Sequence, residues 1–169
     1  MKKVLFKYIV FLTIAILVMP SCKKKETYPV IPEIKYEGFV KIYNPVANKF
    51  ERGVLKLSFK DGDGDIGLRQ SETEPPYDYN LFVKYYEIQN RDTVEVILTD
   101  ISGDTITFNA RIPILTPTGS NKSIKGEIDD TLFIYNYQSN FDTIMYEVYL
   151  IDRALNKSNI IFTPLINRK

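Results

Sequence analysis

Apolar and polar residues alternate along several stretches of this chain, and this period of two is the feature that most limits its fold. Leu55, Leu57 and Phe59 are separated by polar residues, and residues 142–151 repeat the pattern. Successive side chains of a β-strand point to opposite faces of a sheet, so each stretch is expected to place one face on a core and the other in water. After the N-terminal segment no window sustains the apolar spacing of a helix. The alternation therefore predicts an all-β domain.

Strands are expected at residues 36–43, 53–60, 79–89, 93–99, 104–112, 123–136, 142–151 and 159–166. Seven or eight antiparallel strands in a chain of this length predict an immunoglobulin-like β-sandwich. A small closed barrel is the alternative.

The first 21 residues have the layout of an export signal. Lys2, Lys3 and Lys7 accompany an apolar run, residues 8–19, that is too short to span a bilayer. The alternative, a buried helix of the folded domain, would need a polar face that this run almost entirely lacks. The segment is therefore expected to direct export.

Residues 17–22, LVMPSC, end in the only cysteine of the chain. They resemble the lipobox of bacterial lipoproteins, although Met19 and Pro20 depart from its usual residues. The resemblance implies cleavage before Cys22 and attachment of a diacylglycerol and an acyl chain to Cys22, and two lipid signals give stable membrane anchoring where one does not. The chain is then divided into a signal peptide (1–21), a lipidated tether (22–32) and a sandwich domain (33–169).

Cleavage would leave 148 residues, enough for one domain with its own core. They carry 19 basic and 21 acidic side chains, so nothing indicates nucleic-acid binding. The chain has no histidine, and a lipidated Cys22 is not free to react. A disulfide, a cysteine nucleophile, a histidine base and a Cys/His zinc site are thereby excluded, and no catalytic residue is assigned.

An acidic, glycine-rich loop, KDGDGDIGL at residues 60–68, follows one expected strand. Asp61, Asp63 and Asp65 alternate with glycines that let the backbone fold tightly. Three carboxylates at this spacing would repel one another alone but can converge on Ca²⁺, which takes six to eight oxygen ligands in flexible geometry. The alternative is a polar turn that binds no metal.

The spacing of this loop is similar to that of an EF-hand calcium loop. Counted from Asp61 as position 1, the Gly67 carbonyl falls at position 7 and Glu72 at position 12. Ile66 stands where the EF-hand has its glycine, and strands replace the flanking helices. Only the ligand spacing is carried over, not the fold.

A second loop, DRALNKSN at residues 152–159, resembles the turn near the end of many bacterial immunoglobulin-like domains. The strands before the two loops are expected to run the same way, which brings both loops to one end of the sandwich. Asp152, Asn156 and Asn159 would then add oxygen ligands to the acidic loop. Alternatively, Asp152 pairs with Arg153 or caps its own turn.

The two loop motifs behind a lipobox resemble small Bacteroidetes-type lipoproteins with an immunoglobulin-like domain, a group that brings no known activity. Surface-exposed members usually carry an acidic cluster after the cysteine, whereas residues 23–25 here are lysines. The resemblance therefore implies an outer-membrane protein whose domain faces the periplasm. Its expected partner is an outer-membrane protein or an extracellular ligand.

Two classes of function remain open. The first is a non-enzymatic binding or assembly module, favoured by the absence of a nucleophile and base pair. The second is a cell-envelope hydrolase, such as a glycosidase that uses two carboxylates; its candidate acids are Glu72, Glu74, Glu87 and Glu95. Four tyrosines give a similar choice between core packing, which is favoured, and a ligand platform: Tyr77, Tyr79, Tyr85 and Tyr86.

Overall fold

The computed structural model describes residues 26–169, so the export signal and Cys22 lie outside the described residues. Within the described range, no helix is long and apolar enough to cross a membrane. The elements are strands: β1 (Glu33–Asn44), β2 (Lys49–Asp61), β3 (Leu81–Gln89), β4 (Asp92–Glu95), β5 (Ile124–Phe133), β6 (Thr143–Leu150), β7 (Ile161–Phe162) and β8 (Ile166–Asn167).

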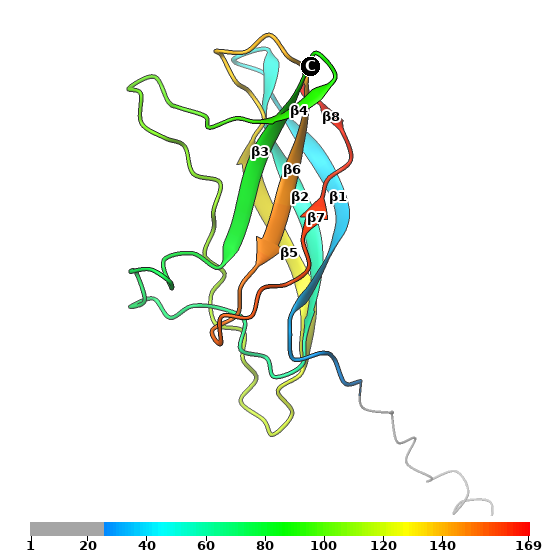
Figure 1. Cartoon of the computed structure of the whole chain (residues 1–169), viewed down its shortest axis with the longest axis vertical. Coiled ribbons are helices and arrows are strands. Elements are labelled where there is room, and N and C mark those ends of the chain that lie inside the picture. Colours follow the sequence, from blue (N-terminus) through cyan, green and yellow to red (C-terminus); the bar gives the residue numbers. More distant parts are fainter. Residues whose placement is uncertain (1–25) are drawn as a thin grey trace, which may run out of the picture.

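The strands form two antiparallel sheets that pack face to face (Figure 1). One sheet has the order β1-β2-β5, and the other has the order β4-β3-β6-β7, with β8 also paired to β6. The predicted all-β sandwich is confirmed, and two separate sheets exclude the closed barrel.

The core lies between the sheets and follows the alternation in the sequence. Leu55 and Leu57 of β2 are fully buried, as are Ile144, Val148 and Leu150 of β6. Aromatic rings fill the middle of this core, where Tyr146 packs edge-on to both Tyr85 and Phe108. The prediction that these stretches turn one face inward is confirmed.

Three strand predictions are wrong in extent. Residues 104–112 form no continuous strand, only bridges at Thr105 and Ala110. Residues 93–99 contribute only the start of their stretch to β4, and residues 159–166 hold β7 and reach only the start of β8. Residues 104–112 still turn Phe108 and Ile112 toward the core, because alternation reports burial and not hydrogen bonding to a neighbouring strand.

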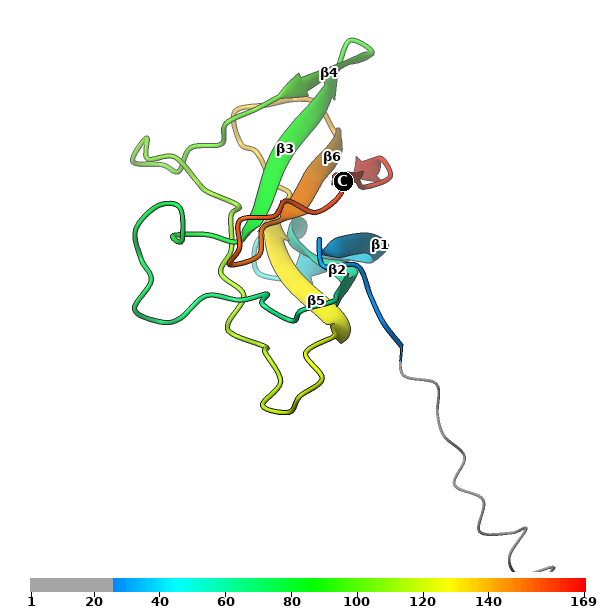
Figure 2. The ribbon, with the colours of Figure 1, turned by 60° about the horizontal axis from the view of Figure 1, so that its bottom comes forward.

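The sandwich has two distinct ends. At one end the chain enters β1, and the loops after β2 and β6 emerge there because Asp61 and Leu150 end strands that run the same way. Figure 2 brings this end forward and shows the long loops that surround it. The opposite end carries the β1–β2 turn, the β5–β6 loop and the last residues of the chain (Figure 1).

Candidate metal centre

Three aspartates of the acidic loop lie together at the end of the sandwich where the chain enters β1. Asp61 is the last residue of β2 and points inward, with 0% of its surface exposed. Asp63 and Asp65 follow on the loop and are half-buried. One carboxylate oxygen from each lies within 4.8 Å of the other two. The strand therefore fixes the first carboxylate, and the loop brings the next two back to it.

Each of these carboxylates has an oxygen without a protein partner. The Oδ1 atoms of Asp61, Asp63 and Asp65 are buried and accept no hydrogen bond from residues 26–169. The other oxygens of two of them are engaged: the Ile66 amide donates to Asp61 Oδ2 (3.3 Å) and the Ala154 amide donates to Asp65 Oδ2 (3.1 Å). Buried polar atoms are nearly always paired, so three unpaired oxygens in one place indicate a missing partner.

The electrostatics of the cluster oppose its full ionisation. Burial, followed by the charges of Asp63 and Asp65, raises the pKa of Asp61 to about 7. Burial also raises the pKa of Asp65, with further contributions from Asp152 and Asp63. Without a cation, Asp61 therefore keeps its proton to a higher pH than an ordinary aspartate does.

This raised pKa predicts how the stability of the cation-free domain changes with pH. Between the unfolded pKa of an aspartate, about 4, and the folded pKa of Asp61, about 7, the folded state binds the proton and the unfolded state does not. In chelator, the free energy of unfolding should therefore fall as pH rises through this window, by at most about 1.4 kcal/mol per pH unit from this group. Urea unfolding at pH 5.5 and pH 7.5 measures the change, and Asp61→Asn should reduce it; an equal slope in the variant would contradict the assignment.

Packing against the core and a neighbouring loop gives the acidic loop its shape. Ile66 is fully buried in the core and holds the loop inward. Gly64 has a φ of +65°, and a Cβ at this position would lie 1.9 Å from the carbonyl oxygen of Lys122. Only glycine allows that approach, so this glycine serves the close packing of residues 113–123 against the cluster.

The β6–β7 loop lies directly beside the acidic loop. Arg153 donates its amide to the carbonyl of Asp65 (3.4 Å), next to the contact of Ala154 with the same residue. The prediction that these two loops meet is therefore confirmed. The Asp152 carboxylate accepts the backbone amide of Asn156 (2.8 Å) and its side-chain Nδ2 (2.9 Å). Asp152 thus caps its own turn and adds negative charge beside Asp65.

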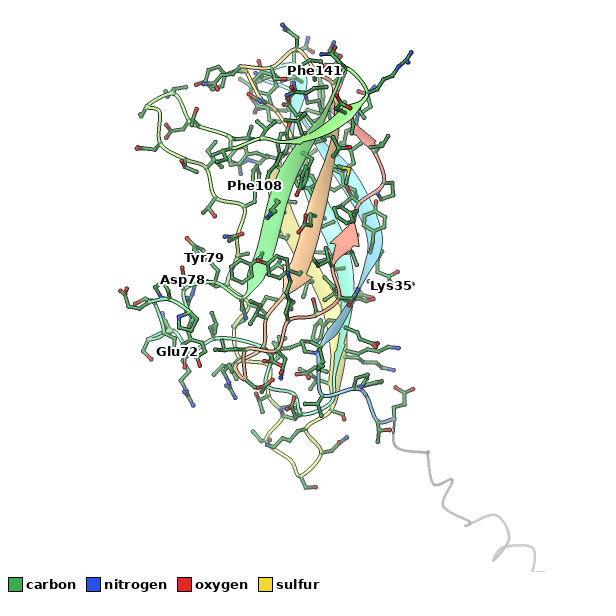
Figure 3. All side chains as sticks on the ribbon, in the orientation of Figure 1. Lys35, Glu72, Asp78, Tyr79, Phe108 and Phe141 are labelled. Carbon is green, nitrogen blue, oxygen red and sulfur yellow. The ribbon has the colours of Figure 1, made fainter. Side chains whose placement is uncertain are left out.

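The other expected ligands are placed differently. Glu72 lies on the outer part of the β2–β3 loop (Figure 3), where its carboxylate accepts the amide of Arg69 (2.6 Å) and pairs with its guanidinium (3.1 Å). Asn159 uses both ends of its amide to bind the backbone of Ile34 in β1, at 2.9 Å each. Gly67, at a φ of +109°, packs its backbone against Pro113. The structure therefore brings together the three aspartates but not Glu72 or the Asn159 amide.

The acidic loop also contacts the segment that leads into β1. The Gly62 amide donates to the carbonyl of Pro29 (2.7 Å), and Ser123 Oγ donates to the carbonyl of Gly62 (2.8 Å). A Cβ at residue 62 would lie 2.4 Å from the Tyr28 carbonyl oxygen. The cluster therefore lies where the tether, the acidic loop and residues 113–123 meet.

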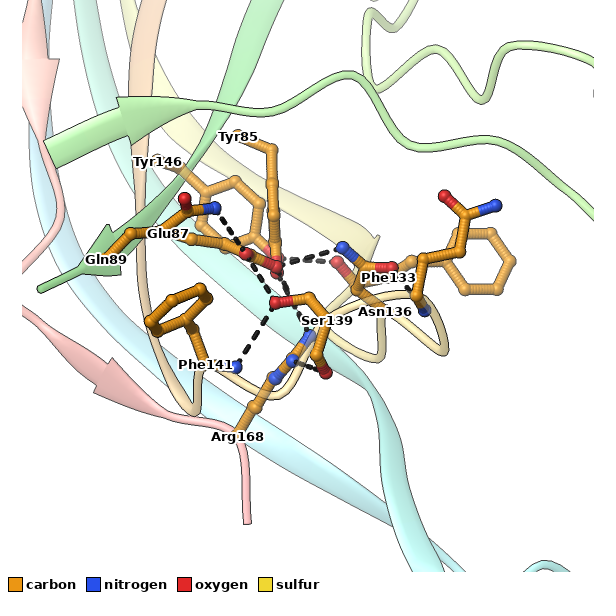
Figure 4. A network of polar contacts seen from close by, with 10 residues as sticks. Tyr85, Glu87, Gln89, Phe133, Asn136, Ser139, Phe141, Tyr146 and Arg168 are labelled. Atoms are coloured by element: carbon orange, nitrogen blue, oxygen red, sulfur yellow. Dashed lines mark hydrogen bonds and ion pairs between the residues drawn. The ribbon is translucent and has the colours of Figure 1, made fainter.

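A buried polar network at the opposite end was not assigned from sequence (Figure 4). Glu87 is 0% exposed and lies 3.6 Å from the guanidinium of Arg168. Burial alone would raise the pKa of Glu87, but hydrogen bonds from Ser139, Asn136, Gln89 and Tyr85 outweigh it and lower the pKa. One signal was available in the sequence: Glu87 continues the inward-facing series of β3.

The four tyrosines for which core packing and a ligand platform are the alternatives take different positions in the structure. Tyr85 is buried in the core, as expected. Tyr86 is half-buried and donates its hydroxyl to Glu147 (2.8 Å). Tyr77 and Tyr79 are half-buried at the end of the sandwich that holds the acidic loop. Only Tyr85 behaves fully as a core residue.

Comparison of the chain with models of protein families, with curated proteins and with solved structures found no match.

Proposed function

We propose that this protein is a lipid-anchored, non-enzymatic binding module whose β-sandwich is stabilised by one calcium ion. The observation that carries the calcium proposal is the fully buried Asp61, whose unpaired Oδ1 belongs to a cluster with two further unpaired carboxylate oxygens. The lipid anchor is inferred from the lipobox-like residues before Cys22.

The size of the cluster agrees with calcium. Ca²⁺ binds oxygens at 2.3–2.6 Å, so two ligands of one ion are separated by at most about 5 Å. The three carboxylate oxygens meet this limit. Asp61, Asp63 and Asp65 would hold the ion, which supplies the positive charge that the cluster lacks. The competing interpretation is that Asp61 carries a proton that it shares with the neighbouring carboxylates. Calcium and that proton would compete for the same carboxylate, so they exclude each other.

The position of the cluster suggests what the ion does. The acidic loop bonds to Pro29 of the tether and to Arg153 and Ala154 of the β6–β7 loop. Removing the repulsion among its carboxylates would hold these segments against the domain. In this proposal calcium fixes the junction between the lipid tether and the sandwich.

The order of the strands supports an immunoglobulin-like sandwich. In that fold the first, second and fifth strands share one sheet, and the third, sixth and seventh share the other. The strands β1, β2 and β5 and the strands β3, β6 and β7 are distributed in the same way.

The surroundings of the candidate acids favour a binding module over a hydrolase. Three of the four candidate acids are engaged in ion pairs: Glu87 with Arg168, Glu72 with Arg69, and Glu95 with Lys84. The fourth, Glu74, is exposed and lies on the loop after β2 with no second carboxylate assigned to it. A general acid or nucleophile must instead reach a substrate.

Replacement of the lipidated residue tests the anchor. The Cys22→Ser protein should remain an uncleaved precursor or be released, and it should be lost from membranes washed with alkaline carbonate. Ser21→Ala, which keeps the cysteine, serves as the control and should stay in the membrane fraction. Membrane retention of Cys22→Ser after the wash would place the anchor elsewhere.

Protease added to intact cells should leave the wild-type protein uncut if the domain faces the periplasm.

A further inference from the structure

A cavity among the described residues lies at the end of the sandwich opposite the acidic loop. It has a volume of about 560 Å³ and is bounded by the β1–β2 turn, the β5–β6 loop and the last residues of the chain. This volume is within the range of small-molecule binding sites. The chain enters β1 at the other end (Figure 1), so the cavity faces away from the tether.

The floor of this cavity is a fixed polar surface. Asn136 and Arg168 line it, and each is only 7% exposed. Asn136 donates to Glu87 Oε1 (2.9 Å), and Arg168 donates to the Ser139 carbonyl (2.8 Å) and to the Tyr85 hydroxyl (3.3 Å). Figure 4 shows these groups around Glu87. Their geometry is therefore set before any ligand arrives.

The walls combine flat apolar faces with uncharged polar groups. Tyr43, Tyr135 and Tyr137 line the cavity and are 48%, 42% and 52% exposed. Asn48 and Asn140 line the same cavity. Exposed rings beside amides suit a ligand that has an apolar face and hydroxyl groups along its edge.

The charges of the cavity are already engaged within the protein. Arg168 is paired with Glu87, and the Lys169 ammonium with the Asp142 carboxylate. The Lys49 ammonium lies 3.6 Å from the centre of the Tyr135 ring, where a cationic ligand would otherwise bind. A purely apolar ligand would bury the amides without partners. These features disfavour ions and hydrocarbons.

We infer that this cavity binds a neutral saccharide. One face of a pyranose ring is lined with C–H groups that stack on an aromatic ring, and its hydroxyls bind the amide groups of asparagines. Tyr43 and Tyr137 provide the stacking surfaces, and Asn48 and Asn140 contact the hydroxyls. The inference depends on neither the lipid anchor nor calcium.

The test uses the protein purified from membranes in a detergent without a sugar headgroup. Calorimetric titration employs neutral hexasaccharides of glucose, mannose, xylose, galactose and N-acetylglucosamine, together with oligogalacturonate as an acidic probe. At least one neutral probe should bind at one site per chain. Tyr137→Ala and Asn140→Ala, both at exposed positions, should weaken binding about tenfold or more, and Tyr137→Phe should retain it because the ring remains.

Tyr79→Ala is the matched control, since Tyr79 lies near the acidic-loop end (Figure 3). It should bind like the wild type. The inference is overturned if no neutral probe binds, if only oligogalacturonate binds, or if both Tyr137→Ala and Asn140→Ala bind as tightly as the wild type.

Discussion

Glu87→Gln is expected to destabilise the domain by about 3–5 kcal/mol, the usual cost of removing one partner of a buried ion pair. The substitution leaves the guanidinium of Arg168, which is 7% exposed, without its counter-charge. It also places an NH₂ group where Ser139 Oγ and Gln89 Nε2 donate at 2.6 and 3.1 Å. Urea unfolding at pH 7 measures the loss.

Two further variants separate the charge effect from a general loss of packing. Glu95→Gln removes a partner of an exposed pair with Lys84 and should cost no more than about 1 kcal/mol. The double variant Glu87→Leu with Arg168→Met removes both buried charges and should recover part of the loss. A cost below about 1 kcal/mol for Glu87→Gln would show that this network contributes little to stability.

Calcium is expected to raise the melting temperature of residues 26–169 strongly at pH 8. At a concentration one hundred times the dissociation constant, an ion that binds only the folded state stabilises it by about 2.7 kcal/mol. For a domain of this size that corresponds to roughly 6–10 °C. Magnesium should substitute poorly, because it requires a smaller octahedral site.

The order of the melting temperatures of the wild type and the Asp61→Asn variant should reverse between chelator and calcium. In chelator the variant should melt at least as high as the wild type, because it removes one of the repelling charges and can still accept the Ile66 amide. In calcium it should melt lower, because a ligand is lost. Asp104→Asn, which removes an exposed charge far along the chain, should follow the wild type in both. A variant that melts below the wild type in both conditions would instead indicate a purely structural Asp61.

The sequence predicted those parts of the fold that depend on local pattern. The inward-facing residues of β2 and β6 could be identified from the alternation of apolar and polar residues, because one face of each strand had to be buried. Residues 104–112 show the same alternation but form no continuous strand. Whether residues 104–112 form backbone hydrogen bonds with β3 depends on the distance between the two segments. The local sequence pattern does not determine that distance.

The candidate site divides in a similar way. The clustering of Asp61, Asp63 and Asp65 follows from their short spacing. Glu72 does not join them, because Ile66 is held in the core and the chain beyond it turns outward to Arg69. The pairing of Glu87 with Arg168 joins residues 81 positions apart, and only the packed sandwich brings them together.

Calorimetric titration of residues 26–169 with calcium at pH 8 tests the central claim most directly. We expect one calcium ion per chain for the wild type, weaker binding at pH 6, where a proton competes for Asp61, and no binding to Asp61→Asn. Absence of binding to the wild type at calcium concentrations up to several millimolar would contradict it and leave the three aspartates as a turn that shares a proton.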